Sequence, residues 1–226
     1  MLKIQSIEKT GKGGYDMKEE ELKEIKDVGG IDLNGIHIMT IIGEIEGHQT
    51  SAQGAKTTKY EHLIPTLAKV ENDPDIKGVL ILINTIGGDV ECGLALAELI
   101  ASLSKPTVSL VLGGSHSIGV PLAVSADDSF IVKSATMMIH PVRTGGTFIG
   151  VIQSYRNIEK IQDRITTFIS DHSNMKKEKV EQLMLSVGEQ VKDVGTILEG
   201  PEAVKLGLID ELGGMKEAFE KLKKRL

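Results

Sequence analysis

Short apolar runs alternate with amphipathic stretches along the middle of the chain. The runs contain many β-branched residues and few polar interruptions, which is typical of strands that are buried on both faces. We therefore expect a strand at each of five segments: IHIMTIIG, GVLILIN, PTVSLVLGG, FIVK and TMMIH.

The stretches between these runs have helical spacing. In residues 57–73 the apolar side chains recur at Leu63, Leu67 and Val70, and a second helix is expected over residues 91–105. A third helix should begin near Ile118. Pro121 is acceptable in its first turn, because the backbone N–H groups of that turn have no partner within the helix. The alternation of strands and helices predicts a parallel sheet with right-handed crossovers.

The C-terminal third is predicted to be helical. Residues 151–172 carry one apolar stripe, and this long helix has little remaining sheet to cover. We expect it to project and to pair with another subunit. The stripe consists of Val151, Tyr155, Ile158, Ile161, Ile165 and Phe168. Shorter helices are expected in KKEKVEQLMLS, GPEAVKLGLID and MKEAFEKLKKRL.

The first residues differ in character from the rest. Residues 1–34 are polar and charge-dense and form few core positions, so we expect an extension that is loose or docked on a partner. Residues 35–226 are expected to form one domain. The N-terminus lacks the apolar segment of a signal peptide and no transmembrane run is present, which favours a cytoplasmic location.

Composition narrows the functional classes. A formal net charge of -6 argues against nucleic-acid binding, and a single cysteine, Cys92, excludes an internal disulfide framework. No metal-binding or phosphate-loop motif is present, so we expect no metal and no cofactor. We interpret Asp127 and Asp128 as solvated loop carboxylates.

The segment GGSHSIGVP carries the strongest candidate chemistry. It places Ser117 among small residues at a strand-to-helix turn, and His140 ends a later strand. A serine hydroxyl becomes a nucleophile when a base takes its proton, so this pair suggests acyl transfer. The glycine pair Gly87 and Gly88 follows another strand, where backbone N–H groups can hold an oxyanion.

Each of these residues also has a structural interpretation. Ser117 suits a helix N-terminus, and Ser115 competes with it for the role of nucleophile. His140 is equally suited to a hydrogen bond with a loop, whereas His116 is a poor base for Ser117 because side chains of adjacent residues rarely face each other. No single element is specific, but their ordered set is.

Several motifs resemble the proteolytic subunit of Clp protease, from about Ile36 to the C-terminus. The resemblance implies the ClpP/crotonase fold: an α/β spiral of repeated β-β-α units with a protruding handle helix. It also implies heptameric rings, often stacked, that enclose the sites, and is compatible with an ATPase partner. The matching segments are ILINTIGGDVECGLALAELI, SIGVPLAVSA, MMIHPV and EGPEAVKLGLIDEL.

By motif, Ser117 matches the family nucleophile and His140 its general base. Gly88 and Ile118 match the residues whose N–H groups form the oxyanion hole. The triad acid does not align cleanly, because the chain carries extra residues before the late helix. Asp193 is the nearest carboxylate and our choice; the weaker alternatives are Asp171 and Glu189.

Two classes of function remain. The first is a self-compartmentalising serine endopeptidase that cleaves peptides or unfolded proteins. The second is a non-proteolytic protein of the same fold, either an acyl-CoA enzyme of the crotonase type or an inactive scaffold. The Ser117 and His140 pair favours the peptidase, because crotonases rely on positioned carboxylates instead.

Overall fold

Nine strands join into one sheet in the computed structural model, which describes residues 29–48, 51–52, 54–145, 149–187 and 194–226. The strands are β1 (Gly30–Leu33), β2 (Ile36–Glu46), β3 (Thr57–Lys59), β4 (Gly78–Gly88), β5 (Thr107–His116), β6 (Asp128–Ile131), β7 (Thr136–Ile139), β8 (Thr196–Glu199) and β9 (Glu211–Leu212). The helices are α2 (Tyr60–Asn72), α3 (Val90–Ala101), α4 (Gly119–Val124), α5 (Val151–Asp171), α6 (Lys177–Met184), α7 (Gly200–Lys205) and α8 (Met215–Arg225). Each expected strand and helix of the domain is present.

The sheet is mainly parallel, as the strand–helix alternation predicts. Its main path runs β1-β2-β4-β5-β6-β9, and all of these neighbours are parallel except β1 and β2. A second antiparallel pair, β7 with β8, lies off this path. The mixed α/β architecture agrees with the fold that the resemblance implies.

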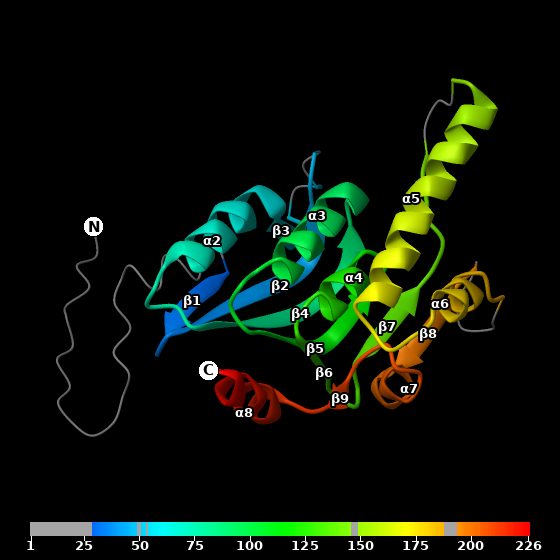
Figure 1. Ribbon diagram of the computed structural model, residues 1–226. Helices are drawn as coiled ribbons and strands as arrows, with labels where there is room; N and C mark the ends of the chain where they lie inside the picture. Colours follow the sequence, from blue (N-terminus) through cyan, green and yellow to red (C-terminus); the bar gives the residue numbers. More distant parts are fainter. Residues whose placement is uncertain (1–28, 49–50, 53, 146–148, 188–193) are drawn as a thin grey trace.

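Helices cover the central strands on both faces (Figure 1). On β4, Val79 and Ile81 belong to the larger core under α2, α3 and α4, whereas Leu80 belongs to a smaller core closed by α8. All three side chains are fully buried. Double coverage explains why these strands read as uninterrupted apolar runs in the sequence.

The two ends of strand β5 pair with different neighbouring strands, and this pairing positions the serine turn. Its first part, through Val111, pairs with β6, and its end, from Gly114, pairs with β7. The end of β5 therefore leaves β6 and carries the GGSHS segment towards β7 and β8.

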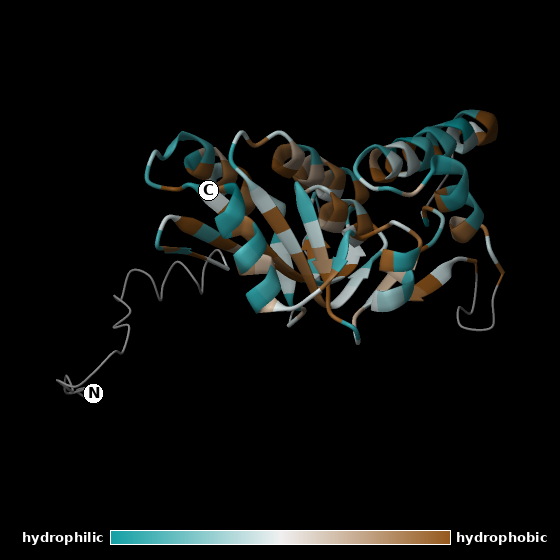
Figure 2. Cartoon of the chain, turned by 60° about the horizontal axis from the view of Figure 1, so that its bottom comes forward, coloured by the Kyte–Doolittle hydropathy of each residue, from teal (hydrophilic) through white to brown (hydrophobic). Residues whose placement is uncertain are grey.

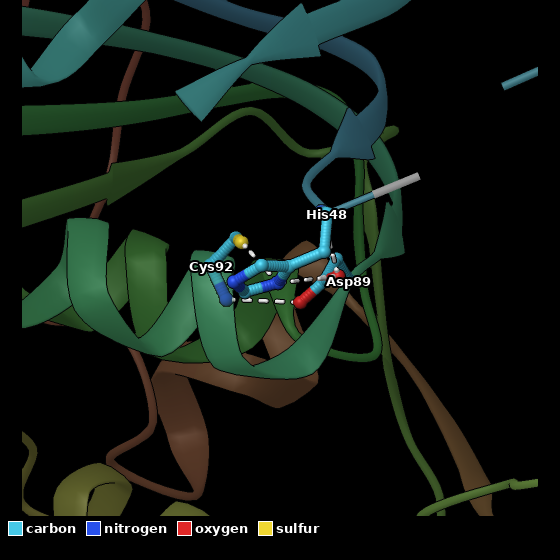
Figure 3. A group of neighbouring side chains, drawn as sticks. All are labelled: His48, Asp89 and Cys92. Atoms are coloured by element: carbon cyan, nitrogen blue, oxygen red, sulfur yellow. Dashed lines mark hydrogen bonds and ion pairs between the residues drawn. The ribbon is translucent and has the colours of Figure 1, made fainter. Parts of the chain in front are cut away.

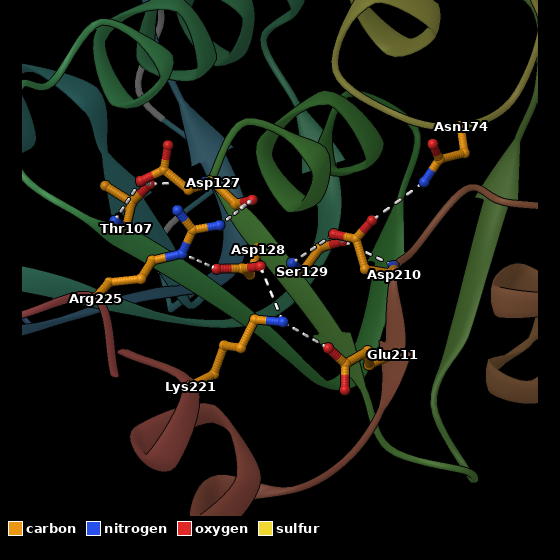
Figure 4. A network of polar contacts seen from close by, with 9 residues as sticks. All are labelled: Thr107, Asp127, Asp128, Ser129, Asn174, Asp210, Glu211, Lys221 and Arg225. Carbon is orange, nitrogen blue, oxygen red and sulfur yellow. Dashed lines mark hydrogen bonds and ion pairs between the residues drawn. The ribbon is translucent and has the colours of Figure 1, made fainter. Parts of the chain in front are cut away.

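Helix α8 is held to the sheet by charges as well as by its apolar face. Asp128 on β6 is buried and pairs with Arg225 and Lys221 of α8, and Lys221 also contacts Glu211 (Figure 4). Asp127 accepts hydrogen bonds from Thr107. Our interpretation of Asp128 as a solvated loop group is therefore wrong, because folding brings Lys221 and Arg225 from the distant C-terminus onto it, whereas Asp127 is exposed in the bend before β6.

Helix α5 projects from the body, as the sequence predicts (Figure 1). Its C-terminal end is buried at Ile165 and Phe168, whereas Ile152 and Tyr155 near its N-terminal end are 64% and 66% exposed. Brown hydrophobic positions mark this projecting end (Figure 2). The apolar stripe thus continues beyond the part of the helix that the domain covers.

The boundary expected at residue 34 falls within folded structure. Strand β1, Gly30–Leu33, pairs with β2, so the last residues assigned to the extension belong to the sheet. Residues 1–28 lie outside the described residues. Within the described part of the chain, no helix is long and apolar enough to cross a membrane.

Candidate active site

Ser117 occupies a strained turn between β5 and α4. Its φ of 58° lies in the left-handed region, which is unusual for a residue with a side chain. Its N–H donates to the carbonyl of Met138 at 2.9 Å, and its own carbonyl accepts from the N–H of Val120 at 3.0 Å. Strained backbone of this kind persists only where the surroundings hold it, and it concentrates at functional sites.

The same hydrogen bond ties the serine turn to the strand that carries His140. In the parallel register of β5 and β7, His116 lies opposite Met138, so the chain beyond each strand places Ser117 near His140. The imidazole is half-buried, and its Nδ1 lies 2.7 Å from the carbonyl oxygen of Pro141. The structure therefore brings together the predicted serine and histidine in one pocket.

The glycine pair at the end of β4 allows the backbone to approach the serine. Gly87 has a φ of 92°, and a Cβ there would lie 2.7 Å from Cβ of Ser117 and 2.8 Å from the carbonyl oxygen of His116. Gly88, with a φ of 151°, lines the pocket beside Ser117. Only glycine fits both requirements at Gly87, the positive φ and the close contact.

Ile118 is anchored by its side chain while its amide remains available. The side chain is 2% exposed and packs against Gly93, where a Cβ would lie 2.6 Å from Cγ1 of Ile118. Among the described residues, no hydrogen-bond partner of the Ile118 N–H is found. An N–H group held rigidly without a partner is suited to stabilise an oxyanion.

The pocket at these groups is small, and both polar and apolar side chains line it. Its volume is about 140 Å³, and it reaches from the serine turn to α5. The residues that line it are Gly88, Val90, Ser117, Ile118, Val120, Ile139, His140, Pro141, Val142, Arg143, Ile165, Ile169 and Met184.

The two competing candidates serve other purposes. Ser115 is fully buried, and its hydroxyl donates to the carbonyl of Gly119 at 2.7 Å. Nε2 of His116 lies 2.9 Å from the hydroxyl of Thr136. Burial, and the nearby His140, lower the pKa of His116, so this imidazole is favoured in its neutral form.

The candidates for the acid differ in their placement. Asp193 and Glu189 lie outside the described residues. Asp171 is exposed at the end of α5 and is not part of the pocket lining. Gly195 touches the base directly, since a Cβ there would lie 2.8 Å from Cβ of His140. The segment that follows Asp193 in the sequence thus lies against the histidine.

Sequence reasoning missed two contributors to the site. Thr85 is buried, donates to the carbonyl of Gly43 at 2.6 Å and accepts from the N–H of Gly87 at 3.1 Å, so it fixes the glycine turn. Its position two residues before the glycine pair was an available signal. Arg143 lines the pocket from the segment after β7, and only the folded chain reveals this.

The sequence of this chain is similar to a known protein family and to named proteins. A family model described as Clp protease matches residues 39–216. The chain is 52% identical over 192 residues to the Translocation-enhancing protein TepA of Halalkalibacterium halodurans, which covers 85% of this chain and 75% of that protein. It is 25% identical over 205 residues to "Putative protease MJ0651" of Methanocaldococcus jannaschii, covering 78% of this chain and 64% of that protein.

Proposed function

The chain belongs to the Clp protease family, and from this premise we propose that it is a serine endopeptidase that cleaves peptides or unfolded protein segments. The observation that carries the proposal is the serine turn. Ser117 adopts a left-handed conformation, and its N–H is hydrogen-bonded to the strand that ends at His140. A merely structural serine would not require this strained presentation.

The proposed reaction uses His140 as the proton carrier. The Nδ1–H group donates to the carbonyl of Pro141, which leaves the Nε2 lone pair to accept the hydroxyl proton of Ser117. The serine oxygen attacks the peptide carbonyl, and the N–H groups of Gly88 and Ile118 hold the resulting oxyanion. The imidazolium then gives its proton to the leaving amine, and an acyl-enzyme forms at Ser117.

Water then hydrolyses the acyl-enzyme by the same proton transfers in the opposite order. His140 takes a proton from the water molecule as its oxygen attacks the acyl carbon, and the second oxyanion forms between the same two N–H groups. Collapse releases the carboxylic acid product and returns the proton to Ser117. The reaction consumes one water molecule and needs no cofactor.

Asp193 is the proposed orienting acid. The support is its place in the sequence just before Gly195, which contacts His140. In the proposed triad its carboxylate would accept the Nδ1–H of His140 in place of the Pro141 carbonyl, and it would stabilise the imidazolium that forms when the serine gives up its proton. Asp171 is the less favourable choice because it is exposed and lies outside the pocket lining.

We also propose that the chain works as a homo-oligomeric ring, a heptamer or two stacked heptamers, with the sites facing an enclosed chamber. The uncovered end of α5 supports an interface between subunits. A chamber excludes folded proteins, so the proposed substrates are peptides or chains unfolded by a separate ATPase.

Labelling with a fluorophosphonate tests the nucleophile. We expect the parent to label and Ser117→Ala to lose labelling, with peptide-ester hydrolysis falling by about a millionfold for a complete triad. Ser115→Ala is the matched control: it removes a buried hydrogen bond, costs about 1 kcal/mol of stability, and should still label. Labelling that survives Ser117→Ala and is lost in Ser115→Ala contradicts the assignment.

The acid is tested in the same assay with Asp193→Asn and Asp171→Asn. We expect a loss of about ten-thousandfold for Asp193→Asn, as for trypsin in the corresponding change, and an unchanged rate for Asp171→Asn. Wild-type rates in both would leave a dyad of Ser117 and His140. Complete absence of labelling and hydrolysis in the parent would favour the non-proteolytic scaffold or the crotonase-type enzyme.

A further inference from the structure

Three side chains with metal-binding chemistry meet at the start of α3, beside the active-site pocket but outside its lining. His48 follows the end of β2, Asp89 caps the N-terminus of α3, and Cys92 lies in its first turn (Figure 3). The imidazole of His48 lies between the carboxylate and the sulfur. None of the three lines the candidate active-site pocket or takes part in the proposed peptidase chemistry.

Two of the three separations between the ligand atoms match those of a tetrahedral metal site. Nδ1 of His48 lies 3.4 Å from Sγ of Cys92 and 3.5 Å from Oδ2 of Asp89, and the three ligand atoms all lie within 4.8 Å of one another. Zinc bonds of about 2.0–2.3 Å at tetrahedral angles place neighbouring ligand atoms about 3.3–3.6 Å apart. The third separation, between Sγ of Cys92 and the carboxylate oxygen of Asp89, is within 4.8 Å, and a rotation of one of these two side chains is needed to close it.

Backbone groups fix one of the three ligands, the carboxylate of Asp89. Oδ1 of Asp89 accepts from the N–H of Cys92 at 3.0 Å, and Oδ2 accepts from the N–H of His48 at 3.3 Å. Gly47 packs so closely on the carboxylate that a Cβ there would lie 2.5 Å from Cγ of Asp89. These contacts orient the carboxylate as hydrogen-bonded neighbours orient the ligands of known metal sites.

The cluster is also accessible from one side. Cys92 is 1% exposed, whereas the side chain of His48 is 69% exposed and that of Asp89 is 28% exposed. An ion can therefore enter past His48 and bind the buried sulfur from the solvent side. Three protein ligands leave a fourth tetrahedral position, which water would fill.

We propose that His48, Asp89 and Cys92 bind a zinc ion. The mixture of one imidazole, one carboxylate and one thiolate favours zinc over magnesium or calcium, which prefer oxygen ligands alone. Sequence motifs did not indicate the site, because His48 lies 44 positions before Cys92 and no paired ligand motif surrounds either.

Binding is coupled to the release of one proton. Burial, and then the carboxylate of Asp89, raise the pKa of the Cys92 thiol to about 11, so the free thiol is protonated at neutral pH. Zinc binds the thiolate, and the thiol proton passes to solvent as the Zn–S bond forms. Zinc affinity should therefore increase as the pH rises, and the bound ion would join the end of β2 to α3 directly after Gly88.

Zinc titration of the full chain, stripped with a chelator and free of any histidine tag, tests the proposal. We expect the parent to bind one Zn²⁺ with these ligands, and bound Co²⁺ to show a thiolate-to-cobalt absorption band. His48→Asn, Asp89→Asn and Cys92→Ser should each weaken Zn²⁺ binding by about a hundredfold or more, and Cys92→Ser should abolish the band. The matched control His62→Asn replaces another exposed histidine and should bind like the parent.

Three outcomes would overturn the assignment. They are a parent that binds no Zn²⁺, ligand variants that keep the parent's affinity, and displacement of the ion by a modest excess of Mg²⁺. Because the side chain of His48 is largely exposed, His48→Asn should keep the circular dichroism of the parent even where Cys92→Ser fails to fold. The test does not depend on the proposed peptidase activity, because it measures Zn²⁺ affinity and the absorption of bound Co²⁺.

Discussion

At the residue scale, the candidate site depends on backbone that would be unfavourable elsewhere. Ser117 adopts a φ of 58°, and the glycine opposite it adopts a φ of 92°. A non-glycine residue in such a region costs about 1–3 kcal/mol, which the neighbouring hydrogen bonds and packing must offset. Ser117 and Gly87 lie in contact, so their geometries depend on each other.

Gly87→Ala tests this dependence. The new methyl would lie 2.7 Å from Cβ of Ser117 and 2.8 Å from the carbonyl oxygen of His116, so the serine turn must shift. We expect a loss of at least about a hundredfold in peptide-ester hydrolysis, because small displacements of reacting groups are costly, together with reduced stability. Hydrolysis rates and urea unfolding measure the two effects.

Gly54→Ala is the matched control. Gly54 has a similar φ of 89°, but a methyl group added there would meet nothing within 4 Å, so this variant isolates the cost of the backbone angle from that of the contact. We expect it to lose about 1 kcal/mol of stability and to keep parental hydrolysis. Equal hydrolysis rates in the two variants would show that the approach of Gly87 to Ser117 has no role in the reaction.

A second residue-scale prediction concerns Asp32, far from the site. Oδ1 of Asp32 lies 2.6 Å from Nδ1 of buried His37, and Oδ2 accepts from Lys69 at 3.2 Å. Burial acts to raise the pKa of Asp32, but the hydrogen bonds to His37 and Lys69 outweigh it and lower the pKa below 3.8. The carboxylate therefore stabilises the fold above this value, and the contribution is lost as the pH falls through the lower, folded-state pKa.

We expect Asp32→Asn to remove that part of the acid sensitivity. Its free energy of unfolding should be lower than the parent's at pH of about 7, and the difference should shrink at pH of about 3. Urea unfolding at both pH values measures the change. Asp75→Asn, which replaces an exposed carboxylate, serves as control, and a difference between parent and Asp32→Asn that is independent of pH would contradict the prediction.

At the element scale, helix α5 has two functions along its length. Its C-terminal end contributes Ile165 and Ile169 to the pocket and to the core, whereas its N-terminal end extends past the domain with apolar side chains exposed. A single amphipathic stripe therefore stabilises the monomer at one end and leaves an uncovered surface at the other.

Ile165→Ala should destabilise the monomer. Ile165 is 7% exposed, and removal of a buried isoleucine side chain costs about 2–5 kcal/mol. Ile64→Ala on α2 makes the same chemical change at a side chain that is 38% exposed and should cost less. Urea unfolding compares the two; equal costs would indicate that the end of α5 does not pack on the domain as described.

At the scale of the whole molecule, the uncovered part of α5 requires an explanation. Exposed apolar patches on soluble proteins usually mark interaction surfaces. The patch comprises Val151, Ile152 and Tyr155 of α5, which are 77%, 64% and 66% exposed, and Ile149 just before the helix, which is 90% exposed. In the proposed ring, contacts between subunits would cover it.

The double variant Ile152→Ser and Tyr155→Ser tests this proposal. We expect the parent to scatter light as an assembly of many 24.4 kDa subunits and the variant to form smaller species, because the substitutions remove apolar contact area without disturbing the core. The control Glu159→Ser changes an exposed polar residue on the same helix and should assemble like the parent. A parent that remains monomeric at micromolar concentration would contradict the ring.

The sequence by itself determined most of the elements of this protein. Apolar runs predicted β2, β4, β5, β6 and β7 but not the short strands β1, β3, β8 and β9, and the helical spacing ran through Leu63, Leu67 and Val70, which are the buried side chains of α2. Motif order also identified the family. These features are local: they depend on backbone preference and on the period with which side chains face the core.

Only the tertiary structure decided which distant residues meet. The division of β5 between β6 and β7 sets the register that places Ser117 near His140. Folding also pairs Asp128 with Arg225 and brings His48 to Cys92. The antiparallel β8 places Gly195 against His140, although the sequence indicated only a nearby carboxylate. Such contacts depend on how strands pair and helices pack across the whole chain, and local sequence patterns do not specify that pairing.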